Sequence, residues 1–125
     1  MEKERWIVDG MNVIGSRPDG WWRDRQGAMK RLAECLAQWA GEREVTVVFD
    51  GRPFDVSVDG VRVEFATRRG PNAADDDIVR MVEADEDPAG LRVATSDRDL
   101  SRRVSELGAE VVSAGTFRTL AGCDS

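Results

Sequence analysis

Short apolar runs and longer segments of helical periodicity alternate along the chain. The runs span residues 6–8, 45–49, 91–95 and 110–112, and they are rich in β-branched side chains. Runs of this length and composition predict strands with both faces buried. Residues 61–65 instead alternate apolar and charged side chains, which predicts a half-exposed edge strand.

Three helices are predicted where apolar residues recur every three or four positions. In residue numbers they run from about 24 to 40, 72 to 83 and 97 to 107. Asn72 is expected to cap the second helix through its side chain, and Ser96 or Asp97 the third.

Strands that alternate with helices imply a parallel sheet with right-handed crossovers. We therefore predict one α/β domain over residues 1–125, with a central, mainly parallel sheet between two helical layers. The strand at residues 6–8 should be central. A switch in strand order should place it beside the strand at residues 91–95.

The composition limits the class of protein. At 125 residues and 41% hydrophobic content the chain suits one domain, and no apolar run approaches the roughly 20 residues of a membrane span. The charged N-terminus does not resemble a signal peptide. With no histidine and no Cys-x-x-Cys, a zinc site is not expected. Cys35 is placed on the buried face of a helix and Cys123 in the tail, so we expect no disulfide scaffold and a cytoplasmic setting.

The net charge of −6 and pI of about 4.7 argue at first against a nucleic-acid partner. Binding depends on local basic patches, however, and not on the average charge. A metal-dependent nuclease also keeps many acids in its site, so the acidic balance does not exclude this class.

Acidic residues follow three of the predicted strands. Asp9 and Asp50 come directly after strands, Asp97 lies just past a third, and residues 75–77 place three consecutive aspartates at a helix start. Groups beyond the carboxyl ends of neighbouring parallel strands converge on one crevice. Two carboxylates about 4 Å apart repel by roughly 4 kcal/mol at an effective dielectric near 20, so a cluster takes up protons or a divalent cation. Oxygen ligands without histidine or thiolate suit Mg²⁺ or Mn²⁺.

Each acid also has a local explanation. Asp97 would cap a helix in either case, and the Asp-Gly pairs at residues 9–10 and 50–51 are ordinary turn sequences. Negative charge at residues 75–77 is favourable in the first turn of a helix. The gathering of several such acids in one α/β chain favours a functional site.

Four short motifs resemble those of NYN domains, within the PIN-like nuclease superfamily. Residues 8–14 (VDGMNVI) resemble the opening DGxN motif, and residues 48–51 (VFDG) resemble the second-strand motif of the YacP-like branch. Residues 74–78 (ADDDI) and 95–99 (TSDRD) are similar to that branch's AD[DE]xI and [TS]SDxx motifs. The motifs occur in order over nearly the whole chain, and the resemblance implies a PIN-like fold.

The resemblance implies Mg²⁺- or Mn²⁺-dependent endoribonucleolytic cleavage. By position, it assigns primary metal ligation to Asp9, Asp75 and Asp97, and the predicted catalytic set adds Asn12, which would orient a ligand or water. The further metal candidates are Asp50, Asp76 and Asp99. Because Asp77 makes three consecutive acids, the resemblance leaves open which two of them point into the site.

Basic and aromatic residues near the strand ends are candidates for RNA contact. The arginines are Arg17, Arg23, Arg25, Arg52, Arg68, Arg69 and Arg98. Trp21 and Trp22 would stack on bases, which is worth about 1–3 kcal/mol per base. The alternative is that one tryptophan packs on the core and the arginines are solvated or pair with acids. The pair at residues 102–103 is expected on a solvated helix face.

Two other function classes also gather acids in an α/β domain and compete with a metal-dependent ribonuclease. One is an RNA- or ribosome-binding module that retains the acids but has little or no catalytic activity. The other is a two-component receiver domain, which also gathers aspartates at strand ends. A receiver needs an acid pair after its first strand and a lysine after its last, and the chain has neither.

Overall fold

A parallel sheet forms the middle layer of the protein. The computed structural model describes residues 3–70 and 72–123. Within them the strands are β1 (Arg5–Asp9), β2 (Glu44–Phe49), β3 (Val61–Phe65), β4 (Leu91–Ala94) and β5 (Glu110–Val112). Their order is β3-β2-β1-β4-β5, and every neighbouring pair is parallel. The predicted sheet, with its first strand central and beside β4, is confirmed.

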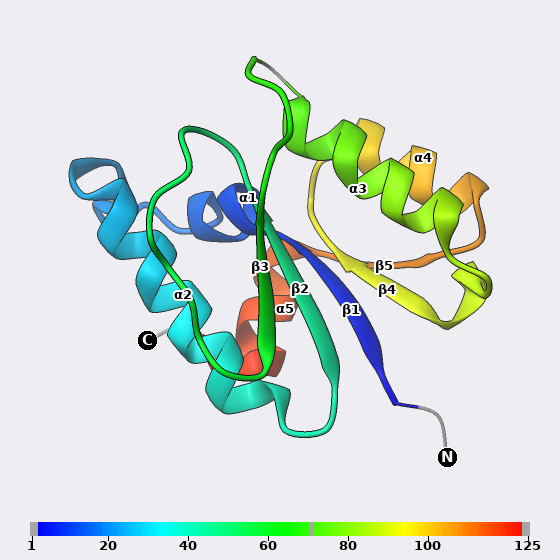
Figure 1. Ribbon diagram of the computed structural model, residues 1–125, viewed down its shortest axis with the longest axis horizontal. Helices are drawn as coiled ribbons and strands as arrows, with labels where there is room; N and C mark the ends of the chain where they lie inside the picture. Colours follow the sequence, from blue (N-terminus) through cyan, green and yellow to red (C-terminus); the bar gives the residue numbers. More distant parts are fainter. Residues whose placement is uncertain (1–2, 71, 124–125) are drawn as a thin grey trace.

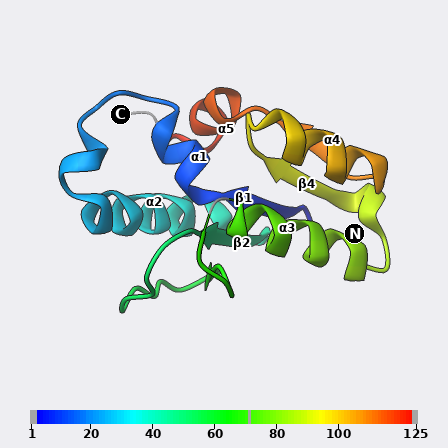
Figure 2. The same cartoon turned by 90° about the horizontal axis from the view of Figure 1, so that it is seen from above.

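Helices cover both faces of the sheet. They are α1 (Gly10–Gly15), α2 (Arg25–Ala40), α3 (Ala73–Ala84), α4 (Arg98–Glu106) and α5 (Ala114–Ala121), with short 3₁₀ turns at Trp21–Arg23 and Pro88–Gly90. Helices α1, α2 and α5 lie on one face, and α3 and α4 on the other (Figures 1 and 2). This confirms the three-layer α/β/α architecture. Within the described ranges, no helix is long and apolar enough to cross a membrane.

The central strand supplies the core on both faces. Trp6 and Val8 pack into the cluster formed with α1, α2 and α5, whereas Ile7 packs into the cluster formed with α3 and α4. All three are at most 5% exposed. Because alternate side chains of a strand point to opposite faces, a strand covered on both sides needs this continuous apolar run.

The junction between β1 and α1 is not the turn that the Asp9-Gly10 pair predicted. The chain passes from the last strand residue directly into the helix. Gly10 lies so close to β2 that a Cβ atom there would collide with the buried ring of Phe49. Glycine is therefore required by close packing. Gly51, by contrast, has a φ of +99° in a turn.

Asn72 occupies the predicted N-cap position of α3 but does not cap the helix through its side chain, and one helix was missed. Asn72 precedes α3 in a left-handed conformation and makes no capping hydrogen bond through its side chain. Helix α5 was not predicted. It is capped by Ser113, whose hydroxyl accepts a hydrogen bond from the Thr116 N–H, and its short apolar pattern follows the last strand without a clear boundary.

The expectation about the cysteines was also wrong. Cys35 is half-buried on α2 and forms a disulfide with Cys123, 88 positions away, with a Cα–Cα distance of 5.9 Å. The two residues meet because α5 packs against α1 and α2, a contact that the unpredicted helix concealed.

Candidate active site

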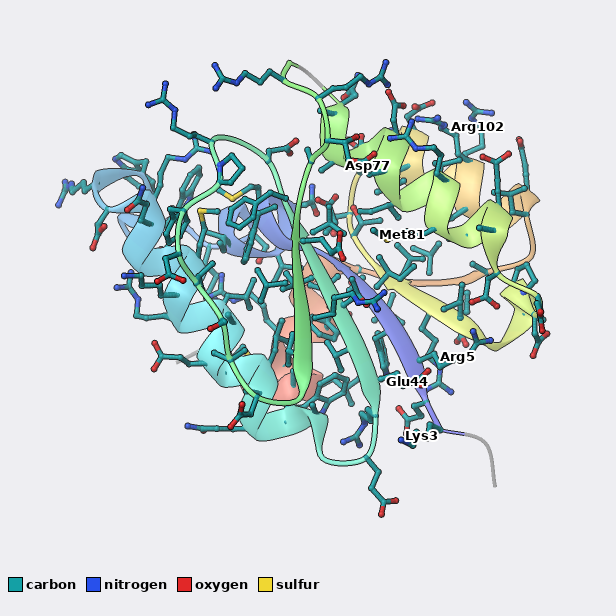
Figure 3. The ribbon with its side chains drawn as sticks, in the orientation of Figure 1. Lys3, Arg5, Glu44, Asp77, Met81 and Arg102 are labelled. Carbon is teal, nitrogen blue, oxygen red and sulfur yellow. A yellow bond between two sulfur atoms is a disulfide. The ribbon has the colours of Figure 1, made fainter. Side chains whose placement is uncertain are left out.

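The predicted acids converge where the strand order switches. Asp9 ends β1, Asp50 follows β2, and Asp97 precedes α4, which follows β4. Asp75 lies in the first turn of α3. Since β1 lies between β2 and β4, the first three positions share one edge of the sheet. Figure 3 shows Lys3, Arg5 and Glu44 at the opposite end of the sheet from Asp77, the next but one residue after Asp75.

Asp9 is the most enclosed of these acids. It is 4% exposed, and its Oδ2 atom accepts a hydrogen bond of 2.8 Å from the Thr95 hydroxyl. Burial raises the pKa of Asp9 to about 7, against the opposing effect of the Thr95 hydrogen bond. The negative charges of Asp75, Asp50 and Asp97 contribute to the same rise.

Asp75 shares the same electrostatic environment. It is 8% exposed, and burial raises its pKa to about 6, followed by repulsion from Asp97 and Asp50. Arg103 acts in the opposite direction. Within the described residues, the Asp75 carboxylate makes no hydrogen bond and no ion pair.

Asp50 and Asp97 each use one oxygen to begin a helix. Asp50 Oδ1 accepts a hydrogen bond of 3.0 Å from the Ala74 N–H and so supplies the contact at the start of α3 that Asn72 does not make. Asp97 Oδ1 accepts one of 2.8 Å from the Leu100 N–H, as a helix cap. The Oδ2 atoms of both acids, and Oδ1 of Asp9, make no hydrogen bond to any described residue. One oxygen of each remains for a cation.

Thr95 and Asn12 hold the acids in place. The Thr95 hydroxyl donates to Asp9 and accepts a hydrogen bond of 3.1 Å from the Asp97 N–H. Asn12 Oδ1 accepts one of 2.8 Å from the Ser96 N–H. Asn12 was predicted to orient a ligand or water, and in the structure it orients the backbone between β4 and α4. Thr95 was not singled out from the sequence, although it begins the motif at residues 95–99.

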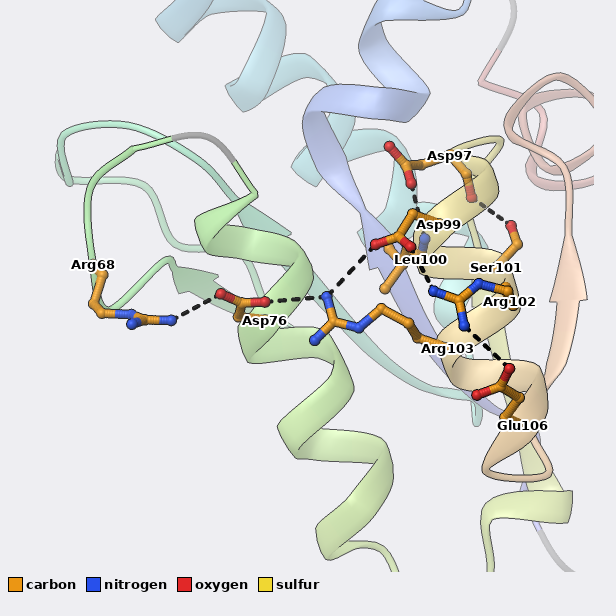
Figure 4. A network of polar contacts seen from close by, with 9 residues as sticks. All are labelled: Arg68, Asp76, Asp97, Asp99, Leu100, Ser101, Arg102, Arg103 and Glu106. Carbon is orange, nitrogen blue, oxygen red and sulfur yellow. Dashed lines mark hydrogen bonds and ion pairs between the residues drawn. The ribbon is translucent and has the colours of Figure 1, made fainter.

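Asp76 and Asp99, also predicted near the metal, lie in an arginine network (Figure 4). Asp76 pairs with Arg68 at 2.8 Å and with Arg103 at 3.1 Å. Asp99 pairs with Arg102 at 2.8 Å. Arg103 was expected on a solvated face, but in the structure it is partly buried between α3 and α4.

Asp77 faces away from the other acids. Its carboxylate accepts hydrogen bonds from the Thr67 N–H at 2.7 Å and the Thr67 hydroxyl at 2.9 Å, and it pairs with Arg80. These contacts secure the segment between β3 and α3. The three consecutive acids thus have different surroundings, and Asp75 is the one that lies with Asp9, Asp50 and Asp97.

The four acids gather at one edge of the sheet without forming a ready-made metal site. Among the described residues, no three acids or cysteines are close enough together to form a ready-made metal site. The donors that do converge are all carboxylate oxygens. Burial and mutual repulsion both raise the pKa values of Asp9 and Asp75. This donor chemistry suits a hard divalent cation such as Mg²⁺ or Mn²⁺.

The arginines predicted to contact RNA are all exposed. Arg68 pairs with Asp76. Within the described part of the chain, the structure gives no ion pair to five of the others: Arg23, Arg25, Arg52, Arg69 and Arg98. Trp21 packs against the core, while Trp22 is 52% exposed and contacts the Trp21 ring edge-on, with centroids 5.8 Å apart. Trp22 is therefore the tryptophan available for stacking.

Comparisons with known proteins agree with this architecture. A search of curated protein sequences found no match. The crystal structure of a mutant of Rae1 (YacP) from Bacillus subtilis superposes with a TM-score of 0.78 and 26% identity, covering 95% of this chain and 75% of the Rae1 chain. A second Rae1 (YacP) crystal structure from the same organism has a TM-score of 0.74 and 24% identity, with coverage of 98% and 74%. The family model described as the YacP-like NYN domain matches residues 6–121, and the chain therefore belongs to this family of nuclease-type domains with the PIN-like fold.

Proposed function

We propose that the protein is a metal-dependent endoribonuclease that hydrolyses phosphodiester bonds in RNA at the Asp9 end of the sheet. The observation that carries this proposal is the convergence of four carboxylates from four separate segments, two of them buried with raised pKa values. Membership of a nuclease-type family supports the reaction class.

Comparison of two buried acids on α3 argues against a purely structural role. Asp77 is buried and fully engaged, with hydrogen bonds from Thr67 and an ion pair with Arg80. Asp75, two positions earlier, is buried to the same degree but has no such partner within the described residues. The Asp75 oxygens still reach solvent, because no fully buried side-chain oxygen of the described residues lacks a hydrogen bond, so this carboxylate is free to meet a ligand or a reactant.

We assign the cation to Asp9, Asp75 and Asp97, with Asp50 beside them. A bound Mg²⁺ or Mn²⁺ would neutralise these carboxylates, lower the pKa of an attacking water and stabilise the charge that develops on the phosphate. Asp76 and Asp99 are less suited to direct ligation because arginines already engage them.

The remaining site residues have positioning roles in this proposal. Thr95 fixes the orientation of Asp9 and the backbone of Asp97, and Asn12 fixes the preceding peptide. These contacts join the segments after β1 and β4. Asp9 and Asp97 therefore keep their spacing in the metal-free protein, in which their negative charges still repel each other.

RNA would be held by local positive charge despite the net charge of −6. Five of the exposed arginines begin α2 or α4 or follow β2 or β3, on the side of the sheet where the acids lie: Arg25, Arg52, Arg68, Arg69 and Arg98. Arginine binds phosphate through paired N–H groups, and the exposed ring of Trp22 offers a stacking surface for a base. These residues would serve equally in the alternative, an RNA- or ribosome-binding module with little catalysis.

The test compares cleavage of single-stranded and structured RNA by the native protein in Mg²⁺, Mn²⁺ and EDTA. Asp9→Asn, Asp75→Asn and Asp97→Asn should each lower the rate at least 100-fold while the circular dichroism spectrum is unchanged. Asp99→Asn and the matched control Glu106→Gln, both in the arginine network, should retain most activity.

RNA binding without metal separates the two functions. We expect the three aspartate variants to bind RNA at least as tightly as the native protein, because each removes a negative charge near phosphate. A native protein that binds RNA but never cuts it in either metal would establish the binding module. Cleavage that survives Asp9→Asn and Asp97→Asn together would refute the assigned site.

A further inference from the structure

The Cys35–Cys123 disulfide ties the end of the described chain to α2. Cys35 lies in the third turn of α2 and Cys123 lies just beyond α5. Both residues are half-buried, so neither sulfur is enclosed by the core. The bond closes a loop of 88 positions. Cross-links that close long loops restrict the unfolded chain strongly, so the bond is expected to affect stability.

Arg118 connects this disulfide to the helix behind the acidic site. Its Nε atom donates a hydrogen bond of 3.2 Å to the Cys123 carbonyl, and Nη1 donates to the Val13 and Ile14 carbonyls, both at 3.2 Å. Arg118 is only 8% exposed. The last carbonyls of a helix have no partner inside the helix, and a buried cation there is favourable. The Val13 carbonyl also accepts hydrogen bonds from the Ser16 N–H and hydroxyl, and Arg118 adds a contact to the Ile14 carbonyl, so Arg118 helps to hold the C-terminal end of α1.

Helix α1 is in turn part of the candidate site. It begins directly after Asp9 and carries Asn12, whose side chain holds the backbone before Asp97. Arg118 therefore links the Cys123 end of the disulfide to α1, and α1 is part of the candidate site. Arg118 also faces Asp19 at 3.6 Å, in the segment that leads to Trp21 and Trp22.

A cavity gives small molecules access to this arrangement. It has a volume of about 170 Å³ and lies between α1, α2 and the segment from Arg118 to Cys123. Its lining includes Cys35, Cys123, Arg118, Asp19 and Trp21. A thiol reagent that enters this cavity reaches the disulfide and the Arg118 contacts together.

We propose that Cys35 and Cys123 form a reversible thiol–disulfide site that controls how firmly α1 and residues 16–24 are held. The co-reactant is a small thiol or dithiol. Its thiolate bonds to one cysteine sulfur, the disulfide breaks, and the electron pair leaves on the other sulfur, which takes up a proton. A second thiol group releases the mixed disulfide. The protein gains two electrons and two protons, and the reagent becomes a disulfide.

Reduction releases the Cys123 side chain from α2, and the Cys123 backbone is then held through α5, where its N–H donates to the Arg118 carbonyl at 2.8 Å. The carbonyl that orients Arg118 Nε then loses its covalent anchor, and the guanidinium holds α1 and Asp19 less firmly. The oxidised form has the ordered α1 and the ordered Trp22 segment. Any effect on RNA cleavage rests on the proposed function, whereas the structural effect does not.

The experiment measures thiols, stability and amide hydrogen exchange on one preparation, oxidised with oxidised glutathione or reduced with dithiothreitol. Thiol titration in denaturant should find no free thiol in the oxidised protein and two after reduction. The melting temperature should fall by roughly 10 °C on reduction. Exchange in residues 10–24 should become several-fold faster, and reoxidation should reverse both changes.

Two variants separate the disulfide from its coupling. The double variant Cys35→Ser/Cys123→Ser should match the reduced native protein and ignore dithiothreitol. Arg118→Lys keeps the charge but loses the forked contacts, so residues 10–24 should exchange fast before reduction, and reduction should add little. If this variant does not fold, the comparison of oxidised and reduced native protein still decides the question.

Two results would overturn the inference. The first is two free thiols after treatment with oxidised glutathione. The second is faster exchange confined to residues 33–37 and 114–123, with residues 10–24 unchanged. Failure of the nuclease proposal gives a different result, because RNA would then be uncut in both redox states while thiols and exchange respond as described.

Discussion

The Thr95 hydroxyl donates a hydrogen bond of 2.8 Å to Asp9 Oδ2, across 86 positions of sequence. The oxygen of the Thr95 hydroxyl also accepts a hydrogen bond from the Asp97 N–H. One hydroxyl thus sets the relation between two of the proposed metal ligands. It also limits the rise in the pKa of Asp9 that burial causes.

Replacing Thr95 tests this relation. Thr95→Val keeps the shape but leaves the Asp9 carboxylate and the Asp97 N–H without a partner, at a cost of about 1–3 kcal/mol in the free energy of unfolding. In the native protein the Thr95 hydrogen bond lowers the pKa of Asp9, so its loss should raise that pKa. The midpoint of the acid limb of the cleavage profile should then move to higher pH. Thr95→Ser should restore the native profile. An unchanged pH profile in the valine variant would show that the bond has no role in the site.

The stability of the metal-free protein should depend on pH in a defined direction. The folded pKa values of Asp9 and Asp75, about 7 and about 6, lie above the value near 3.9 of an unfolded aspartate. Between about pH 4 and 7 the folded state therefore binds more protons than the unfolded state, and these groups make stability fall as pH rises. The expected loss is on the order of a few kcal/mol.

Thermal unfolding in EDTA from pH 4.5 to 8 measures this dependence. Asp9→Asn should flatten it, because asparagine does not titrate. Control Asp99→Asn should leave it unchanged, since Asp99 is exposed and paired with Arg102. A native protein that gains stability from pH 5 to pH 8 in EDTA would contradict the prediction.

Divalent metal should offset the same repulsion. At tenfold excess over Kd, Mg²⁺ or Mn²⁺ should add about 1.4 kcal/mol to the free energy of unfolding. For a chain of this length, the melting temperature rises by roughly 3–6 °C. The rise should be larger at pH 8 than at pH 5, because protons compete for the carboxylates of Asp9 and Asp75. Equal shifts in the native protein and in Asp9→Asn/Asp75→Asn would place the metal elsewhere.

Gly10 should tolerate no side chain. Gly10→Ala brings a methyl group into the Phe49 ring beside Asp9 and should lower stability by about 1–3 kcal/mol. Gly115→Ala is the matched control, because Gly115 is also helical and a Cβ there would meet no atom within 4 Å. Urea unfolding of both variants provides the comparison. Equal stabilities would show that the β1–α1 junction can adjust.

The exposed arginines should determine how RNA binding depends on salt. Arg52→Gln/Arg69→Gln should weaken binding and reduce the salt slope by roughly 1.4, at about 0.7 for each phosphate contact with single-stranded RNA. Arg102→Gln should have little effect, because Arg102 pairs with Asp99 and Glu106. Fluorescence anisotropy in EDTA at several salt concentrations measures the slopes. A slope unchanged in the double variant would exclude these two residues from the RNA interface.

Much of the fold could be predicted because its signals are local. A strand buried on both faces, such as residues 6–8, must be apolar throughout, and a helix such as α2 must repeat its apolar residues every three or four positions. The alternation of the two then requires parallel pairing. The gathering of Asp9, Asp50 and Asp97 at one edge follows from that topology alone.

Other features depend on which segments meet in space. The sequence could not distinguish Asp75, Asp76 and Asp77, since three neighbouring helical positions point in three directions. Their partners come from elsewhere in the chain: Thr67 and Arg80 for Asp77, and Arg68 and Arg103 for Asp76.

The layers, the central place of the first strand beside the Leu91 strand and the edge where the acids gather could be predicted from the amino-acid pattern, because burial imposes a repeat that each segment shows independently. The Thr95–Asp9 hydrogen bond, the Asp50 contact at the start of α3 and the Cys35–Cys123 disulfide could be found only in the folded protein. Each of these joins residues at least 24 positions apart. Such contacts depend on a few atoms of two packed segments and leave no periodic signal in either one.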